Sequence, residues 1–274
     1  MERILGQLGI DFDWRFTLII ASLIFIRWMM ISATIPFLTG KPVPAALKVS
    51  LALAVVVFLY PYLAPADRAA IKLAPLAMIF LYLKEALYGI AIGFTASIVF
   101  YGFEAAGSMI DNQRGAAQAR LLIPQFGQEG SVFGQFVFLL GVVLFISIGG
   151  HLFFFETAVR SYEYLPLLEI PKASPDLIGL VDEFVELTGL VLLLSIQLCA
   201  PVLIAILVAD LILGIISKAA PAINVWEMGF VIRGVLGVLV VFLSLGLMVT
   251  QMEKISLGMV QQVEGIIRFL AKPL

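Results

Sequence analysis

The fold class is decided by the stretch Leu187 to Ala209, LTGLVLLLSIQLCAPVLIAILVA, whose 23 consecutive residues carry no formal charge. A membrane-spanning helix needs roughly 20 mainly apolar residues, so this stretch is long enough to cross a membrane. It lacks the alternation of a membrane barrel strand, which leaves a helix as the spanning structure. Five other runs are similar, the third of them long enough for a bent or extended helix: Phe16–Phe37, Val49–Ala66, Leu73–Phe103, Gly130–Phe155 and Met228–Met252. The sequence therefore predicts an all-α membrane protein with about six long apolar helices arranged in hairpins.

The composition of the whole chain agrees with this interpretation and excludes several classes of protein. Of the 274 residues, 62% are hydrophobic and only 13% are charged, whereas soluble domains are about a quarter charged. The net charge of -2 supplies no basic surface for DNA or RNA, so no nucleic-acid partner is expected. A single cysteine, Cys199, and a single histidine, His151, exclude a disulfide framework and a metal cluster built from these residue types. No cofactor is predicted.

The end of the chain, Glu253 to Leu274, has a different pattern from the apolar runs. Apolar residues recur there at helical spacing with charged and amide residues between them. This pattern predicts an amphipathic helix that lies on a membrane surface or on a partner. The alternative is a solvated end of the sixth apolar segment. If six segments cross the membrane, lysine and arginine are more numerous on the side of the two termini, which favours cytoplasmic termini.

Five charged residues lie within the apolar runs or at their edges: Arg27, Lys84, Glu85, Asp210 and Arg233. A charge at the bilayer centre costs at least ~2.5–3.5 kcal/mol on insertion scales, so each needs a partner, a water-filled cavity or a place outside the lipid. Lys84 and Glu85 project about 100° apart on a helix, so at least one of them is expected to meet another helix or subunit. For Arg27 and Arg233 the alternative is a side chain that reaches the membrane interface from near a helix end. On this basis the isolated chain is expected to be unstable, because its buried charges would lack partners.

The polar segment between Glu104 and Glu129 is built largely from small residues. Asp111 and Arg114 are three residues apart, so they can pair on one helix face, and Glu104 is a second possible partner for Arg114 if the segment folds back. The small residues from Ala105 to Ala119 allow a close approach to another backbone, as in a narrow space inside a bundle or ring. The alternative interpretation is a solvated loop with ordinary ion pairs.

Four stretches of the chain, taken in order, carry a resemblance. They are Gly107–Ala116 (GSMIDNQRGA), Gly149–Leu152 followed by Leu165-Pro166, Ala200–Leu203 (APVL), and Leu213–Val225 (LGIISKAAPAINV). Together they resemble the SctT proteins of type III secretion systems (the YscT, HrcT and SpaR type), the injectisome relatives of flagellar FliR. Gly149 stands where the flagellar proteins have Asn, and Trp226 stands where the family often has Phe.

The resemblance implies a division of the chain into an export-gate membrane domain over residues 1–252 and the amphipathic helix over 253–274. Residues 15–186 would stand in for an SctR-like subunit, and residues 187–252 would form an SctS-like or FliQ-like helical hairpin. Such a protein closes a helical ring of SctR-like and SctS-like subunits, because one distinct subunit can end a heterologous series. The implied location is the bacterial inner membrane, with multiple crossings and the possibility that the assembly is raised toward the periplasm.

The resemblance also implies a non-enzymatic role at the entry pore for unfolded secreted proteins. It places a plug around Asp111, Asn112, Gln113, Arg114, Gly115 and Arg120. Contacts with other subunits are expected at Lys84, Glu85, Glu104, Asp210, Lys218 and Asn224, and the turn Ser217–Glu227 is expected to contact an SctU-like switch protein. A pore of this kind must seal against ions when idle without holding any one side chain tightly, and small residues with a few paired charges suit that task.

Other functions are left open by the residues themselves. A flagellar FliR counterpart is the nearest alternative. A secondary transporter would account for the intramembrane charges and the Gly- and Pro-interrupted helices, although equivalent broken helices do not recur in the two halves. An intramembrane protease could use Ser108 with His151, but no Gly-x-Ser-x-Gly turn accompanies them.

Overall fold

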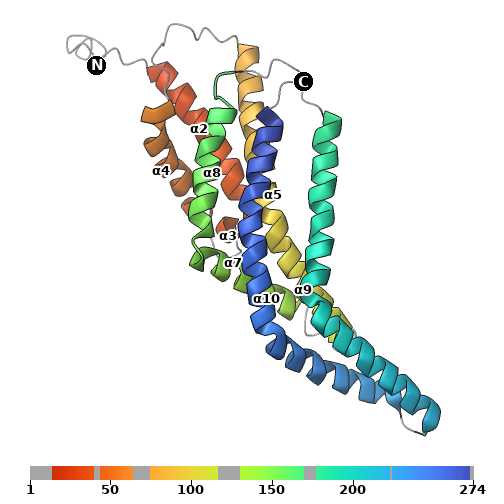
Figure 1. The fold of residues 1–274 in the computed structure, drawn as a ribbon. Coiled ribbons are helices and arrows are strands. Elements are labelled where there is room, and N and C mark those ends of the chain that lie inside the picture. Colours follow the sequence, from red (N-terminus) through yellow and green to blue (C-terminus); the bar gives the residue numbers. More distant parts are fainter. Residues whose placement is uncertain are drawn as a thin grey trace, which may run out of the picture. The chain divides into compact units, whose positions relative to one another are not determined.

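The structure is a computed structural model that describes residues 14–39, 44–63, 75–116, 130–169, 177–222 and 224–271. All regular elements in these ranges are helices, which confirms the predicted all-α class (Figure 1). In chain order they are α2 (Trp14–Thr34), α3 (Pro36–Thr39), α4 (Ala45–Leu63), α5 (Pro75–Gln113), α7 (Val132–Ser147), α8 (Gly150–Tyr164), α9 (Leu177–Ala219) and α10 (Val225–Ala271).

Five of these helices, α2, α4, α5, α9 and α10, are long and apolar enough to cross a membrane. A sixth crossing is possible if α7 and α8 together form one bent span. The apolar run Gly130–Phe155 is not one continuous helix, because α7 ends at Ser147 and α8 leaves at an angle of 75°. Gly149 has a φ of +74°, a backbone conformation that residues with a Cβ rarely adopt, and it makes this change of direction possible.

Three helices are much longer than a bilayer requires. α5 has 39 residues, α9 has 43 and α10 has 47. At about 1.5 Å per residue these lengths are roughly 60–70 Å, about twice the ~30 Å hydrocarbon core. α9 contains Pro201, which cannot donate a backbone hydrogen bond, and Figure 1 shows that this helix changes direction partway along its length.

The predicted amphipathic helix over 253–274 is not a separate element. It is the C-terminal part of α10, which continues unbroken to Ala271, because no glycine–proline stop lies near Met252. Its apolar residues Met259, Val263 and Ile266 are buried within the chain. The alternative of a solvated end of the sixth segment does not fit this burial, and the division of the chain at residue 252 stays a prediction.

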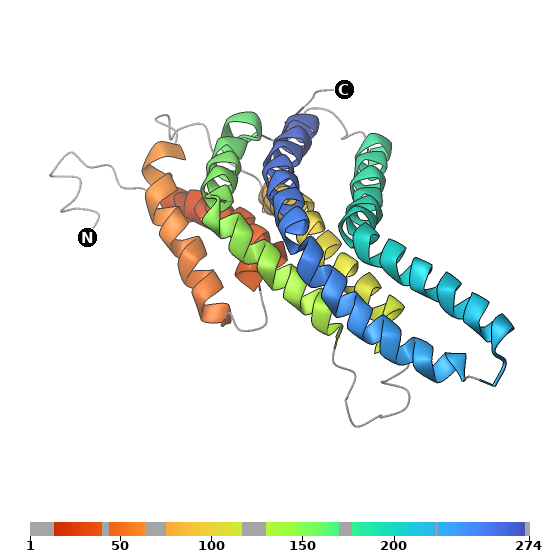
Figure 2. The ribbon, with the colours of Figure 1, turned by 60° about the horizontal axis from the view of Figure 1, so that its bottom comes forward.

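The chain groups into two units that do not follow the order of the sequence. Unit 1 contains residues 1–97, 155–181 and 262–274, and unit 2 contains residues 98–154 and 182–261. Both units cross the boundary that the sequence predicts at Glu186, so that division stays a prediction based on resemblance. In unit 1, α2 lies beside α4 (Figure 2), and the hydroxyls of Thr17 and Tyr60 are 2.9 Å apart.

The close packing of α5 on α2 in unit 1 depends on the Gly-x-x-x-Gly pattern of Gly89 and Gly93, which our sequence analysis did not use. A Cβ at Gly89 would lie 2.5 Å from the backbone oxygen of Arg27 and 2.8 Å from Cβ of Met30. A Cβ at Gly93 would collide with Oγ1 of Thr34. The two glycines therefore let the backbones of α5 and α2 approach each other.

We expect Gly89→Ala to destabilise the purified protein, because the added Cβ meets backbone atoms of Arg27 that cannot move aside independently. Overpacking of this kind typically costs about 1–3 kcal/mol. The matched control is Gly246→Ala on α10, where a Cβ would meet no atom within 4 Å. Thermal unfolding in one detergent should show a lower Tm for Gly89→Ala and an unchanged or higher Tm for the control. Equal melting of the two variants would contradict the proposed α5–α2 contact.

Candidate functional site

Asp111 lies at the C-terminal end of α5 and joins it to the start of α7. Its Oδ2 accepts hydrogen bonds from the Ser131 hydroxyl at 2.6 Å and from the Phe133 backbone N–H at 2.9 Å. Its Oδ1 accepts from Nη1 of Arg114 at 3.3 Å. The Asp111 carboxylate is buried and all three donors lie in unit 2. We call the group formed by Asp111, Arg114, Ser131 and Phe133 the Asp111 clamp.

The start of α7 suits a carboxylate at this place. Ser131 is the N-cap of α7, and its hydroxyl oxygen accepts a hydrogen bond from the Gly134 N–H at 2.8 Å. Asp111 accepts the Phe133 N–H, so two of the unpaired amides in the first turn are satisfied by side chains. The positive end of the α7 dipole and the Arg114 guanidinium both stabilise the buried negative charge of Asp111. The clamp therefore acts as a second cap for α7, supplied by α5.

Two glycines of the predicted segment fix its geometry. A Cβ at Gly107 would collide with the backbone carbonyl of Phe133 and lie 2.6 Å from the Gly134 nitrogen, so α5 touches the backbone of α7 there. Gly115 has a φ of +84°, which ends α5 with a left-handed turn. This confirms that small residues in this segment permit a close approach to another backbone.

The guanidinium of Arg114 stacks on an aromatic ring as well as pairing with Asp111. Its Cζ lies 4.6 Å from the centre of the Phe133 ring, within the range of a cation–π contact. The Arg114 side chain is 20% exposed and that of Asp111 is 4% exposed, so the pair is largely removed from solvent. The attraction between these charges is stronger than in a solvated pair, because less water screens them.

The structure brings together part of the predicted plug. Asp111, Arg114 and Gly115 lie in or beside the clamp, and the pairing of Asp111 with Arg114 is as the spacing predicts. Asn112 and Gln113 are exposed at the end of α5. Glu104, the second possible partner of Arg114, is exposed on α5, and Arg114 pairs with Asp111. Arg120 lies outside the described residues.

Lys84 and Glu85, predicted as contacts with another subunit, have partners within unit 1. Glu85 is fully buried, and its Oε2 accepts a hydrogen bond from Nε of Arg27 on α2 at 2.5 Å. Arg27, also fully buried, donates through Nη1 to the Ser161 hydroxyl at 3.0 Å and through Nη2 to the Leu165 carbonyl at 2.8 Å. We call Arg27, Lys84 and Glu85 with these partners the Arg27 network.

Lys84 holds the segment that follows α8. Its Nζ donates to the carbonyl oxygens of Pro166, Leu167 and Glu169 at 2.6, 2.9 and 2.9 Å, and lies 3.1 Å from Oε1 of Glu85. The expectation that these charges lack partners in the isolated chain is therefore wrong, because helices distant in sequence supply them. Their assignment to a subunit interface stays a prediction.

The remaining predicted interface residues lie along the α9–α10 hairpin in unit 2, whose two helices run side by side near their connecting turn (Figures 1 and 2). Asp210 on α9 accepts a hydrogen bond from Nε of Arg233 on α10 at 2.6 Å, and about a third of each side chain is exposed. Lys218 and Asn224 are exposed near the turn. Asp210 thus has a partner within the chain, and contacts of all three residues with other subunits stay predictions.

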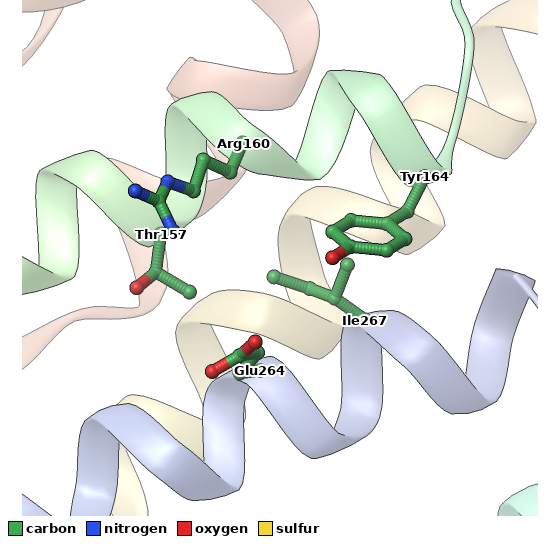
Figure 3. Close-up of a pocket in the computed structure, with 5 residues that line it drawn as sticks. All are labelled: Thr157, Arg160, Tyr164, Glu264 and Ile267. Carbon is green, nitrogen blue, oxygen red and sulfur yellow. The ribbon is translucent and has the colours of Figure 1, made fainter.

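A small pocket lies in unit 1 between α8 and the last turns of α10 (Figure 3). Its cation, Arg160, pairs with Glu156 at 2.7 Å, and the lining carboxylate of Glu264 pairs with Arg268 at 2.6 Å. The charges at this pocket are therefore already compensated by neighbours on their own helices. Within the described ranges, no group of three or more His, Cys, Asp or Glu side chains could hold a metal ion.

The sequence profile described as "Bacterial export proteins, family 1" matches residues 18–259, which include both the Arg27 network and the Asp111 clamp. The chain belongs to this family. The resemblance to the SctT and FliR proteins is thereby confirmed. Membership of this family gives the chain a role in protein export.

The similar proteins have names from two kinds of system: protein translocation or surface presentation, and flagellar biosynthesis. "Yop proteins translocation protein T" of Yersinia pestis is 31% identical over 214 residues, which cover 78% of this chain and 81% of the relative. "Surface presentation of antigens protein SpaR" of Shigella flexneri is 33% identical over 166 residues, covering 60% and 62%. "Flagellar biosynthetic protein FliR" of Pectobacterium carotovorum subsp. carotovorum is 26% identical over 223 residues, covering 81% and 83%.

In this member of the export family, sequence reasoning missed Ser131 and Phe133, the α7 half of the clamp. Ser131 carried a usable signal, since a serine directly before an apolar run is a typical N-cap. Nothing in the spacing connected it with Asp111, 20 residues earlier. Arg27 was recognised as an intramembrane charge, but its contact with Glu85 joins residues 58 apart in sequence.

Proposed function

We propose that this export protein is the SctT-type subunit of a type III secretion export apparatus and that the Asp111 clamp helps to close its export path. The observation that carries the closure part is the pair of hydrogen bonds that Asp111 accepts from the Ser131 hydroxyl and the Phe133 N–H, which join the end of α5 to the start of α7, with Arg114 as the third donor to Asp111. The names of the relatives support the first part, because the Yersinia pestis translocation protein and the Shigella flexneri surface-presentation protein are 31% and 33% identical, and the Pectobacterium FliR protein 26%.

The clamp has the properties that a displaceable closure needs. It consists of a few charge-assisted hydrogen bonds and one cation–π contact, with small residues at the backbone contact. Each such contact in a poorly hydrated place is worth more than the ~0–1 kcal/mol of a surface pair. A closed state favoured by only a few kcal/mol opens when a substrate supplies the same free energy, and losing one contact shifts the populations measurably.

The proposed partners follow from the family resemblance. They are SctR-like and SctS-like subunits, an SctU-like switch protein and unfolded secreted proteins in transit, in the bacterial inner membrane. Two features of the chain support an assembly of this kind. α9 and α10 expose many large apolar side chains, among them Leu211, Phe242 and Leu247. The helices also exceed the thickness of a bilayer, which suits an assembly raised toward the periplasm.

The closure role predicts a leak when the clamp is broken. Asp111→Ala and Arg114→Ala, each expressed with the partner subunits, should raise the conductance of ions or small solutes across the inner membrane while the complex still assembles. Deleting Asn112–Gly115 should raise it further, because the deletion removes both Arg114 and the turn at Gly115. Asn112→Ala, a neighbouring exposed residue outside the clamp, is the matched control. Assembled complexes with wild-type conductance in all three clamp variants would reject the closure role and favour an ordinary structural contact.

The proposed contact with the switch protein predicts a specific crosslink. Asn224 is exposed in the turn between α9 and α10, so a cysteine placed there should react with cysteines in the cytoplasmic loop of an SctU-like partner. Cysteines at the exposed position Phe58, on α4 in unit 1, provide the comparison. If several well-expressed pairs with Asn224→Cys fail to crosslink, or crosslink no better than pairs with Phe58→Cys, the proposed contact is wrong.

A further inference from the structure

The seat of the Arg114 side chain includes a residue on α10 that lies far from it in sequence. A Cβ at Gly237 would collide with Cγ of Arg114, and would lie 2.6 Å from its Cδ and 3.3 Å from its Nε. Gly237 is buried, and both residues belong to unit 2. The methylene groups of Arg114 therefore occupy the space that a side chain at residue 237 would need.

We propose that Gly237 is a positioning residue for the clamp: it forms the notch on α10 that seats Arg114 against Phe133 and Asp111. This inference rests on the proposed function of the clamp. The notch fixes the stem of Arg114, the Phe133 ring lies beneath the guanidinium at 4.6 Å, and Asp111 takes one of its N–H groups at 3.3 Å. With three sides fixed by α10, α7 and α5, the long side chain keeps one arrangement.

The other glycines of α10 show that this contact is specific to Gly237. A Cβ at Gly234, Gly246, Gly258 or Gly265 would meet no atom within 4 Å, and at Gly229 the nearest atom would be Leu213 Cδ1 at 3.4 Å. Glycine in a helix costs about 0.5–1 kcal/mol relative to alanine, so a buried glycine with a neighbour in its Cβ position has a packing reason to be there. At Gly237 that neighbour is the clamp arginine.

The atoms that Gly237 meets belong to a flexible side chain and not to a backbone. A methyl group at residue 237 can therefore be accommodated if Arg114 rotates away, which preserves the helices but removes the guanidinium from Phe133 and Asp111. The Arg114 Nε already has no hydrogen-bond partner in the described part of the chain, so the seat depends on packing at this atom. Through Gly237, a displacement of α10 would release the clamp, which links the α9–α10 hairpin to closure.

The test is a double-mutant cycle of Gly237→Ala and Arg114→Ala in the full chain assembled with its partners, with Gly234→Ala as the matched control. Two measurements are made on every variant: the Tm of the purified complex and the conductance of the membrane. We expect Gly237→Ala to lower the Tm by about 2–4 °C and to raise conductance several-fold, toward the Arg114→Ala level. In the Arg114→Ala background the same change should be neutral or raise the Tm, and should add no further leak. Gly234→Ala should leave the conductance unchanged and the Tm unchanged or slightly higher in either background, because its Cβ would meet no atom within 4 Å.

The two measurements separate the inference from the function on which it rests. Tm values that are non-additive, with wild-type conductance in every variant, would keep the Gly237 seat but reject the closure role of the clamp. A leak in Arg114→Ala together with additive Tm values and no leak in Gly237→Ala would keep the closure role and overturn the inference. Additivity in both measurements means that Gly237 and Arg114 act independently, which also overturns it.

Discussion

Glu85→Ala is expected to prevent a stable folded chain from accumulating. Its carboxylate is fully buried and pairs with the fully buried Arg27 at 2.5 Å and with Lys84 at 3.1 Å. Removing it leaves two cations without their counter-ion in an apolar surrounding. Breaking a buried pair by removing one partner typically costs about 3–5 kcal/mol, a large part of the ~5–15 kcal/mol that stabilises a folded protein.

The measurement is the amount of chain recovered from membranes and its Tm in detergent. Glu156→Ala is the matched control, because it deletes the same side chain from the exposed pair with Arg160 and is expected to have little effect. Glu85→Gln keeps the shape of the side chain but loses its charge, so it should fall between wild type and Glu85→Ala. If Glu85→Ala accumulates and melts like the control, the Arg27 network does not stabilise unit 1 in the way its geometry indicates.

The Arg27 network marks the limit of what the sequence could predict about unit 1. Charges inside apolar runs are visible in the sequence, and their cost requires partners. The identity of the partners was not visible, because Arg27 binds Ser161 and Leu165, 134 and 138 residues away. The alternative left open for Arg27, a side chain reaching the interface, is excluded by its complete burial. Local spacing cannot reveal a contact that forms only when distant helices pack.

Only the Asp111–Arg114 half of the clamp could be predicted, because it is the only half that depends on local spacing. Asp111 and Arg114 are three residues apart on one helix, and a pair at that spacing meets without any tertiary structure. Ser131, Phe133 and Gly237 come from other helices, so only the packing of α5, α7 and α10 brings them to Arg114 and Asp111. The break at Gly149 is a different case. Membrane helices tolerate glycine, so two adjacent glycines in an apolar run did not by themselves indicate a change of direction of 75°.

Gly107→Val is expected to open the export path more than Arg114→Ala does, because it separates α5 from α7 by a wedge of atoms that neither helix can avoid. The first added atom, Cβ, would collide with the Phe133 carbonyl group and lie 2.6 Å from the Gly134 nitrogen. All of these are backbone atoms in the first turn of α7, so no side-chain rotation relieves the contact. This differs from Gly237, where a flexible side chain can move away.

The wedge should weaken two of the three hydrogen bonds that Asp111 accepts, since the Ser131 and Phe133 donors move away with the start of α7. We therefore expect a greater conductance than in Arg114→Ala, which removes only one of the three. Gly107→Ala carries the same Cβ without the added branches, so its complex should also conduct more than the wild type. This variant provides the test if the valine variant fails to assemble. Gly102→Ala is the control on the same helix, because its Cβ would have an ordinary contact with Leu194 at 3.5 Å. Assembled Gly107→Val and Gly107→Ala complexes that conduct no more than Gly102→Ala would show that the contact between α5 and α7 does not close the path.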